Sequence, residues 1–358
     1  MRRIIMLLLA CLLVGCTGTA SDSPQSRADR PPLSEPTEAL RLPDGYHAEL
    51  MVEGLQGPTQ MILGPDGRLW VAQLAGAENA GQGQVVALDM NTGSQELLLA
   101  GLDKPTGIAR LDEALWLQAG NSLLRAPLVG DRVGTPDVML ADLPFNGRSL
   151  GTLTVTPEGN LLFETSGRRD GNAASEGSGI LWELDPADPT HPRPLATGLK
   201  GAYAHAFDAA GRLWSTEIGD DPVNGMAPPD ELNLIEVGSD YGWPACFGMQ
   251  EPATNYGGSA AQCATTRAPV ALFAERATPV AVVVSPWEAE RLLVALWGPG
   301  DRGVVRVAVR GEGGEVSGEV TPFIEGMGNP QSLLVLPDGS LLAADFDGGR
   351  IYRITAEK

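Results

Sequence analysis

The sequence predicts an all-β fold, a six-bladed β-propeller, and three observations support this. A unit of two short apolar strands joined by a turn recurs six times, at irregular spacing of roughly fifty residues. Most copies continue into a third strand, and no long stretch of helical periodicity interrupts the chain after its N-terminal segment. Short strands repeated in this way are typical of propeller blades. A β-sandwich with coincidental turns is the alternative.

Each copy starts with a Gly- or Pro-containing entry. The six entries are Gly54–Pro58, Gly101–Pro105, Asp142–Pro144, Gly198–Gly201, Arg276–Pro279 and Gly326–Pro330. The predicted third strands are Gln84–Asp89, Ser122–Pro127, Ile180–Asp185, Glu231–Val237, Gly303–Val309 and Arg350–Ile354. The clearest turns read Pro-Asp-Gly, in which Pro presets φ and Gly accepts a positive φ. Either Glu38–Leu42 or Tyr46–Val52 is predicted to supply the strand that closes the ring.

The N-terminal segment predicts export and lipidation. Met1–Gly15 combines a basic start with an apolar run too short to span a bilayer, and it ends directly before Cys16. This pattern indicates a bacterial lipoprotein signal peptide, although an ordinary secretory signal has the same general form. Residues 16–37 are predicted to be a lipidated Cys and a flexible tether, and residues 38–358 to be the propeller. Because Thr17 follows the Cys, we expect a periplasm-facing protein anchored in the outer membrane.

The charge balance excludes one class of partner. The formal net charge is -20, and it becomes -22 when Arg2 and Arg3 leave with the signal peptide. A surface this acidic repels nucleic acid and anionic lipid headgroups. We therefore expect no nucleic-acid binding, and contact with the membrane through the lipid anchor alone.

Two of the four cysteines are predicted to form a disulfide. Cys11 lies in the signal peptide and Cys16 is the lipidation site, which leaves Cys246 and Cys263 in one loop-rich stretch. In an exported protein such a pair is expected to be oxidised.

Gly198–Pro244 is the stretch in which we expect chemistry. It contains the predicted strands Tyr203–Phe207, Arg212–Glu217 and Glu231–Val237, with an acidic loop before the last of them. The loop Asp220–Glu231 nearly matches an EF-hand, but Pro222 stands at its third ligand position and strands flank it. It is either an irregular calcium loop or a solvated acidic loop.

Two motifs in this stretch resemble the glucose/sorbosone dehydrogenase family. They are Asp230-Glu-Leu-Asn-Leu-Ile235 and Gly238-Ser-Asp-Tyr-Gly-Trp-Pro244. The opening Leu42–Tyr46, the repeats and the closing Ile351–Ile354 are also similar, so the resemblance covers the chain from about residue 42 to its end. It implies a six-bladed propeller that holds pyrroloquinoline quinone (PQQ) and calcium and oxidises sugars. It also implies Asp230, Glu231 and the carbonyl of Tyr241 as calcium ligands.

The sequence departs from the family pattern where the cofactor and the catalytic base are expected. Arg148 stands where the family has its catalytic His, and a guanidinium cannot act as a general base. The family's Arg-Asn-Pro matches Lys200-Gly201-Ala202, and its Gly-Arg-Pro matches Gly328-Asn329-Pro330. The resemblance therefore implies Lys200, Gly201 and Asn329 as the cofactor-binding positions, with fewer cations than the family uses for the three quinone carboxylates.

Two other groups bear on the site. His205, in a predicted inner strand, is either a packed structural residue or a substitute base. Arg168 and Arg169 end a predicted strand and form either a solvated turn or, if they converge with Arg148 and Lys200, a basic patch that selects an anionic ligand.

These observations predict a periplasm-side lipoprotein that resembles PQQ-dependent sugar dehydrogenases but has weak or no dehydrogenase activity. Calcium is expected as a ligand, and PQQ only if the remaining contacts hold it. The expected partner is a sugar or a small anionic ligand. The alternative is a non-enzymatic propeller that binds a ligand or a partner at its mouth. A lactonase-type hydrolase ranks last, because the acidic metal ligands of such a site cannot be assembled from this sequence.

Overall fold

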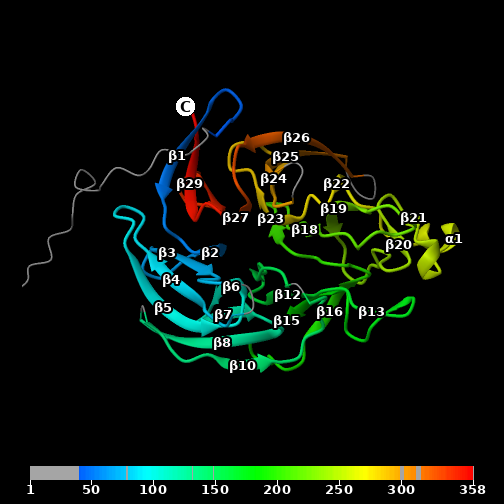
Figure 1. Cartoon of the computed structure of the whole chain (residues 1–358), viewed down its shortest axis with the longest axis horizontal. Coiled ribbons are helices and arrows are strands. Elements are labelled where there is room, and N and C mark those ends of the chain that lie inside the picture. Colours follow the sequence, from blue (N-terminus) through cyan, green and yellow to red (C-terminus); the bar gives the residue numbers. More distant parts are fainter. Residues whose placement is uncertain are drawn as a thin grey trace, which may run out of the picture. The chain divides into compact units, whose positions relative to one another are not determined.

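Figure 1 shows the chain as a computed structural model, which describes residues 40–77, 80–130, 132–147, 149–298, 302–311 and 316–357. The chain divides into two units, Met1–Pro32 and Leu33–Lys358. The predicted signal peptide, Cys16 and the tether lie outside the described residues, and so does Arg148. Within the described residues, no helix has the length and apolar composition needed to cross a membrane.

The second unit is a six-bladed β-propeller, as predicted, and each blade is an antiparallel sheet. Blade 1 consists of β2 (Pro58–Leu63), β3 (Leu69–Gln73), β4 (Gly83–Leu88) and β5 (Gln95–Leu102). Blade 2 consists of β6 (Pro105–Leu111), β7 (Ala114–Ala119), β8 (Ser122–Val129) and β10 (Asp137–Leu140), with the short β9 (Arg132–Val133) beside β8. Blade 3 consists of β11 (Thr154–Val155), β12 (Leu161–Thr165), β15 (Ile180–Leu184) and β16 (Arg193–Thr197).

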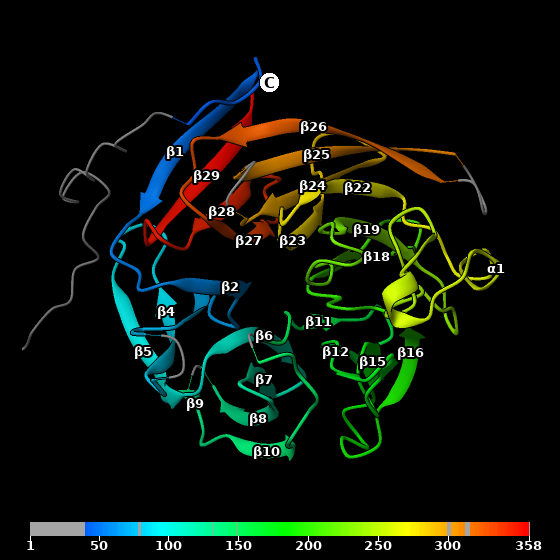
Figure 2. The ribbon, with the colours of Figure 1, turned by 45° about the vertical axis from the view of Figure 1, so that its right-hand side comes forward.

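The remaining three blades follow in chain order. Blade 4 consists of β17 (His205–Phe207), β18 (Leu213–Glu217), β19 (Pro229–Ile235) and β22 (Ala271–Glu275). Blade 5 consists of β23 (Pro279–Val284), β24 (Arg291–Leu296), β25 (Gly303–Arg310) and β26 (Ser317–Glu325). Blade 6 consists of β27 (Pro330–Val335), β28 (Leu341–Asp345), β29 (Arg350–Ala356) and β1 (Tyr46–Val52). Figure 2 shows β2, β6, β11, β23 and β27, each the first strand of its blade, around the centre of the ring.

The N-terminal strand closes the ring. Strand β1 pairs antiparallel with β29, the last strand of the chain, and places Leu50 opposite Tyr352. Of the two segments considered for this role, Tyr46–Val52 is therefore the one that fills it. Both ends of the propeller thus lie in one blade, where hydrogen bonds between the first and last strands hold the circle closed.

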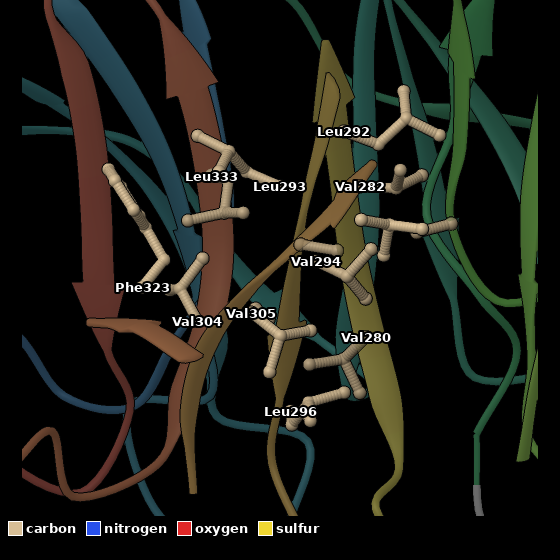
Figure 3. Close-up of a cluster of buried hydrophobic side chains, with 14 of the residues drawn as sticks. Val280, Val282, Leu292, Leu293, Val294, Leu296, Val304, Val305, Phe323 and Leu333 are labelled. Carbon is tan, nitrogen blue, oxygen red and sulfur yellow. The ribbon is translucent and has the colours of Figure 1, made fainter. Parts of the chain in front are cut away.

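The turns and the core follow the sequence pattern. Gly67 and Gly339, at the ends of the Pro-Asp-Gly turns, have φ of 77° and 81°, which a residue with a Cβ rarely adopts. Alternation within the strands buries apolar side chains between adjacent blades. Figure 3 shows such a cluster, in which Val282 and Val294 of blade 5 pack together with neighbours that include Phe323 and Leu333.

Strand boundaries differ slightly from prediction in blade 4. The sequence predicts one strand over Glu231–Val237, but β19 starts at Pro229 and ends at Ile235. The chain leaves the sheet there because the Glu236 N–H donates to the Tyr241 hydroxyl at 2.9 Å. That hydroxyl in turn donates to the carbonyl of Leu234 at 2.7 Å, which fixes the corner after the strand.

Two insertions lie beside one end of the ring. One is the hairpin of β13 (Arg169–Asp170) and β14 (Ala173–Ala174) in blade 3. The other, between β19 and β22, contains β20 (Cys246–Phe247), β21 (Glu251–Pro252), a 3-10 helix at Thr254–Tyr256 and α1 (Ala260–Cys263). A disulfide joins Cys246 to Cys263 within it. The insertions touch where the Arg169 guanidinium stacks 3.6 Å from the centre of the Tyr256 ring.

Candidate functional site

One large cavity lies at the end of the ring where the first strand of each blade begins and the second strand ends. Its volume is about 810 Å³, and all six blades line it. One lining residue from each blade, in order, is Thr59, Thr106, Glu164, Tyr203, Val280 and Gln331. Antiparallel pairing explains the location, because the start of a first strand and the end of the next must lie at the same edge of a blade. A cavity of this size accommodates a small-molecule ligand.

Cationic side chains line this cavity although the chain is strongly acidic. Among the described residues, the cations that line it are Lys104, Arg168, Arg169 and Lys200, and the acidic residues that line it are Glu164, Asp220 and Asp221. Lys200 and the pair Arg168–Arg169 therefore meet at one cavity, as required for the predicted basic patch. Their position favours an anionic ligand over a cationic one.

The Arg169 side chain is fixed by its neighbours. Its Nε lies 3.4 Å from Oδ2 of Asp220, and its guanidinium stacks on Tyr256. The same Oδ2 accepts a hydrogen bond from the Trp243 indole at 2.9 Å. The Arg168 side chain, in contrast, is exposed and makes no ion pair with another described residue. Arg168 is thus the more available of the two for a ligand.

The predicted cofactor positions are only partly brought together. Lys200 and Gly201 line the cavity, but Asn329 is not among its lining residues. The Asn329 side chain is instead buried, and its Nδ2 donates to Asp347 at 2.6 Å. Its backbone N–H donates to Asp345 at 2.9 Å. Asn329 therefore holds the turn after β28.

His205 lies in the interior of blade 4 and does not line the cavity. Its side chain is 6% exposed, and neither ring nitrogen has a hydrogen-bonding side chain beside it among the described residues. Burial lowers the pKa of His205 to about 4, although the backbone at Ala202 acts in the opposite direction. Its role as a substitute base remains a prediction. No described residue that lines the cavity is a histidine.

The predicted calcium ligands occupy different environments. Asp230 is 2% exposed, and its carboxylate oxygens accept the backbone N–H groups of Gly219 and Thr278, both at 2.6 Å. The bond from Thr278 ties blade 4 to the start of blade 5, so Asp230 already has a structural role. Glu231 accepts the Gly248 N–H at 2.7 Å and lines a small second cavity of about 20 Å³ together with Tyr241.

Glu217 lies beside Glu231 and is a candidate site residue that the sequence alone does not indicate. The two occupy paired positions on β18 and β19, and both line the small cavity. Burial raises the pKa of Glu231 to about 7, and it raises the pKa of Glu217 well above its usual range, with the charge of Glu231 adding to the effect. Both are glutamates near strand ends in the sequence, but only the strand register shows that they face each other.

The donor set of the small cavity fits one hard cation. Two carboxylates with unfavourable mutual charge and a backbone carbonyl at Tyr241 are oxygen ligands of the kind calcium prefers. A volume of about 20 Å³ holds a single ion or water. Among the described residues, however, no cluster of three or more His, Cys, Asp or Glu side chains has the geometry of a metal site. Calcium would therefore need backbone oxygens or water to complete its shell.

Comparisons with known proteins identify the relatives of this chain. The sequence profile of the family described as Glucose / Sorbosone dehydrogenase matches residues 189–319. The resemblance to the glucose/sorbosone dehydrogenase family is confirmed. This match contains both motifs on which the resemblance rests. No curated protein matches the sequence significantly.

Solved structures show the same fold at low identity. The calcium structure of the Family AA12 carbohydrate-active enzyme from Trichoderma reesei has a TM-score of 0.74 at 17% identity, covering 89% of this chain and 97% of that one. A putative oxidoreductase (glucose dehydrogenase) from Thermus thermophilus has a TM-score of 0.68 at 20% identity, with coverages of 87% and 100%. The PQQ-bound aldose sugar dehydrogenase from Streptomyces coelicolor has a TM-score of 0.64 at 19% identity, with coverages of 88% and 100%.

The large cavity fits the quinone of this family in size and charge. It has the volume for a small aromatic ligand, and its cations complement carboxylates. The aromatic residues Tyr203, Trp297 and Phe346 also line it. The fit is incomplete at Asn329, which is bonded to the acidic turn after β28.

Proposed function

We propose that this chain is a lipid-anchored, periplasm-facing propeller that binds a small anionic ligand in the large cavity and has weak or no sugar dehydrogenase activity. One observation carries the proposal: Lys104, Arg168, Arg169 and Lys200 line a single cavity of a chain with net charge -20. Such a local reversal of charge concentrates anions where the rest of the surface repels them.

Two cofactors of the family enter the proposal. Glu217, Glu231 and the carbonyl of Tyr241 would hold a calcium ion, and the large cavity would take the quinone. When bound, the quinone supplies an acceptor for the electrons of a sugar. The residues of this chain contribute charge and aromatic surface around it, but among the described lining residues no imidazole is placed to accept a proton.

The non-enzymatic alternative uses the same cavity. A propeller that binds a sugar acid or another small anion without oxidising it needs the cations but no base. Both versions share the step that we propose to test first, which is the binding of an anion at Lys200 and Arg168.

Isothermal titration calorimetry with D-glucuronate, a sugar carrying one carboxylate, tests anion binding. We expect Lys200→Gln and Arg168→Gln each to weaken binding roughly tenfold or more, because each removes a charged hydrogen-bond donor. Arg310→Gln is the matched control, since Arg310 lies on blade 5 and pairs with Glu319 outside the cavity. Binding that is unchanged in both cavity variants would show that the anion binds elsewhere.

A spectrum of the purified protein with calcium and quinone separates the enzymatic and non-enzymatic versions. A bound quinone with little dye-linked oxidation of aldoses agrees with the first version. Anion binding without quinone binding agrees with the second. The proposed envelope location depends on Leu13–Cys16 and has its own test, given below.

A further inference from the structure

Glu164 is a buried carboxyl group that faces the large cavity without a side-chain partner among the described residues. It lies on β12 of blade 3, is 2% exposed and lines the cavity. Neither of its carboxylate oxygens accepts a hydrogen bond from a side chain of the described residues. Buried polar groups are almost always hydrogen-bonded, because an unpaired one loses its hydration without compensation. A buried carboxyl group at a cavity that lacks a side-chain partner therefore points to a ligand atom that satisfies it.

Lys200 reaches the same cavity from the segment that connects β16 of blade 3 to β17 of blade 4. Gly167 makes room for it, because a Cβ at Gly167 would lie 2.6 Å from Cδ of Lys200 and 2.6 Å from the Trp243 ring. The aliphatic part of Lys200 thus packs over a glycine, beside an indole. Among the described residues the ammonium group forms no ion pair within 4.0 Å, not even with Glu164. Lys200 and Glu164 therefore face one cavity, and each side chain can form a further hydrogen bond with a ligand there.

Burial favours the protonated form of Glu164 near neutral pH. Burial raises its pKa to about 8, whereas the charge of Lys200 and the backbone N–H of Gly151 act in the opposite direction. The other charged groups that line the cavity, within the part of the chain that the structure describes, are Lys104, Arg168, Arg169, Asp220 and Asp221. A protonated carboxyl group is a hydrogen-bond donor, so near neutral pH Glu164 and Lys200 offer a ligand one neutral and one charged donor.

We propose that Glu164 and Lys200 form a subsite for the carboxylate of a small polyhydroxylated acid, with Glu164 donating its proton to one carboxylate oxygen and Lys200 donating to the other. This rests on the proposed function, in which the cavity binds an anion. A single ammonium beside a neutral acid matches one negative charge. A dianionic phosphate suits the subsite less well, because Lys200 and a neutral Glu164 would leave one of its two charges unmatched.

The subsite makes ligand binding depend on protonation. Below pH 8 Glu164 donates a hydrogen bond to the ligand. Above pH 8 it ionises, loses that proton and repels the ligand carboxylate. Affinity for the acid should therefore fall as the pH rises through about 8, by up to about tenfold for each pH unit. A neutral sugar lacks the charge that causes the repulsion, so its affinity should change little.

Calorimetric titrations between about pH 6 and pH 9.5 test this with D-glucuronate and D-glucose, which differ only at C6. In the wild-type protein we expect glucuronate affinity to fall above pH 8 and glucose affinity to stay level. In Glu164→Gln, glucuronate affinity should no longer depend on pH in this range. Glu158→Gln, the same change in the exposed turn before β12, should keep the wild-type profile.

Three outcomes distinguish the inference from the proposed function. If Glu164→Gln keeps the fall above pH 8, the inference is wrong and anion binding by the cavity stands. If glucuronate fails to bind the wild-type protein at any pH, both are wrong. If glucose 6-phosphate binds more tightly than glucuronate, the carboxylate assignment is wrong.

If the Glu164→Gln variant does not fold, a measurement on the wild-type protein alone still tests the inference. Titration of glucuronate at pH 9 in buffers of different ionisation enthalpy counts the protons exchanged on binding. We expect uptake of about one proton per ligand, because the bound carboxylate stabilises the protonated form of Glu164. Binding without proton uptake would overturn the inference.

Discussion

Glu217 and Glu231 both accept a hydrogen bond from the same side-chain amide, that of Asn233. Its Nδ2 donates to Glu217 at 3.0 Å and to Glu231 at 3.2 Å, and the two glutamates occupy paired positions on β18 and β19. The Asn233 Oδ1 is buried and has no hydrogen-bond partner among the described residues. Two adjacent buried carboxyl groups with raised pKa values favour either a retained proton or a bound cation.

Calcium should therefore stabilise the folded protein. A ligand that binds only the folded state raises the free energy of unfolding by about 2.7 kcal/mol at a concentration 100 times its Kd. We expect the melting temperature to rise in millimolar calcium for the wild-type protein. Glu217→Gln and Glu231→Gln should respond little, because each removes a charged ligand.

The control for this experiment is Glu251→Gln. Glu251 lies on the neighbouring strand β21 and is exposed, so its loss should leave the calcium response intact. A melting temperature of the wild-type protein that neither calcium nor a chelator moves would count heavily against the site.

His205 should make the protein sensitive to acid. Its pKa is about 4 in the folded state and about 6.5 when unfolded. Between these values the unfolded chain binds a proton that the folded protein does not, so stability is present above pH 6.5 and is lost as the pH falls towards 4. The loss amounts to roughly 3 kcal/mol at most. His205→Gln should remove it.

Urea unfolding of the wild-type protein and His205→Gln at pH 7 and pH 4.5 isolates this contribution, because the raised pKa values of Glu164 and Glu231 act in the opposite direction in both proteins. His191→Gln is the control, because His191 is 79% exposed and its loss should leave the acid sensitivity unchanged. Equal acid sensitivity in His205→Gln and the wild-type protein would show that His205 is not the group responsible.

The fold was predictable because it depends on local and repeated signals. Turn chemistry such as Pro337-Asp338-Gly339 and alternating apolar residues mark each strand pair in isolation. Few folds are compatible with six copies of such a strand pair in one chain. The end of β19 was not predictable, because it depends on the Tyr241 hydroxyl binding the Glu236 N–H, which is a contact between side chain and backbone.

The site was less predictable because it depends on the register between paired strands and on the distance between residues of different blades. Lys200 and Arg168 could be proposed to converge, since both follow the repeat pattern at strand ends. Glu164 carries no motif, and only burial next to a cavity distinguishes it from the solvated glutamates of this chain. The pairing of Glu217 with Glu231 likewise requires knowledge of the register between β18 and β19.

The disulfide between Cys246 and Cys263 should stabilise the protein measurably. The two residues are 17 positions apart, and closing a loop of this size contributes roughly 3 kcal/mol in the chain-entropy model. Denaturant unfolding with and without a reductant, on a chain expressed from Thr17, should show a loss of about this size. A free-thiol titration of the unfolded, unreduced chain that finds both thiols reactive would exclude the bond.

Membrane attachment should depend on Cys16. The motif Leu13-Val14-Gly15-Cys16 predicts that the Cys carries the lipid, so Cys16→Ser should leave no lipid anchor and release the protein from membranes. Fractionation of cells that express each form measures this. A variant that stays membrane-bound and is processed as the wild type is would contradict the lipoprotein prediction. Because Thr17 follows the Cys, the wild-type protein should be found with the outer membrane.

Sugar oxidation should be weak or absent even with calcium and quinone supplied. Oxidising a sugar hydroxyl requires a base to take the proton as hydride leaves, and a His of near-neutral pKa suits that task. The sequence resemblance implies that Arg148 stands at the family position for this base, and His205 is buried away from the cavity with a pKa of about 4. By the same resemblance, Lys200-Gly201-Ala202 and Asn329 are expected to weaken quinone binding independently, so Arg148→His alone should not restore turnover. Dye-linked assays with glucose and other aldoses measure this. Robust quinone-dependent turnover by the wild-type protein would prove the prediction wrong, and its loss in His205→Ala would then identify His205 as the base.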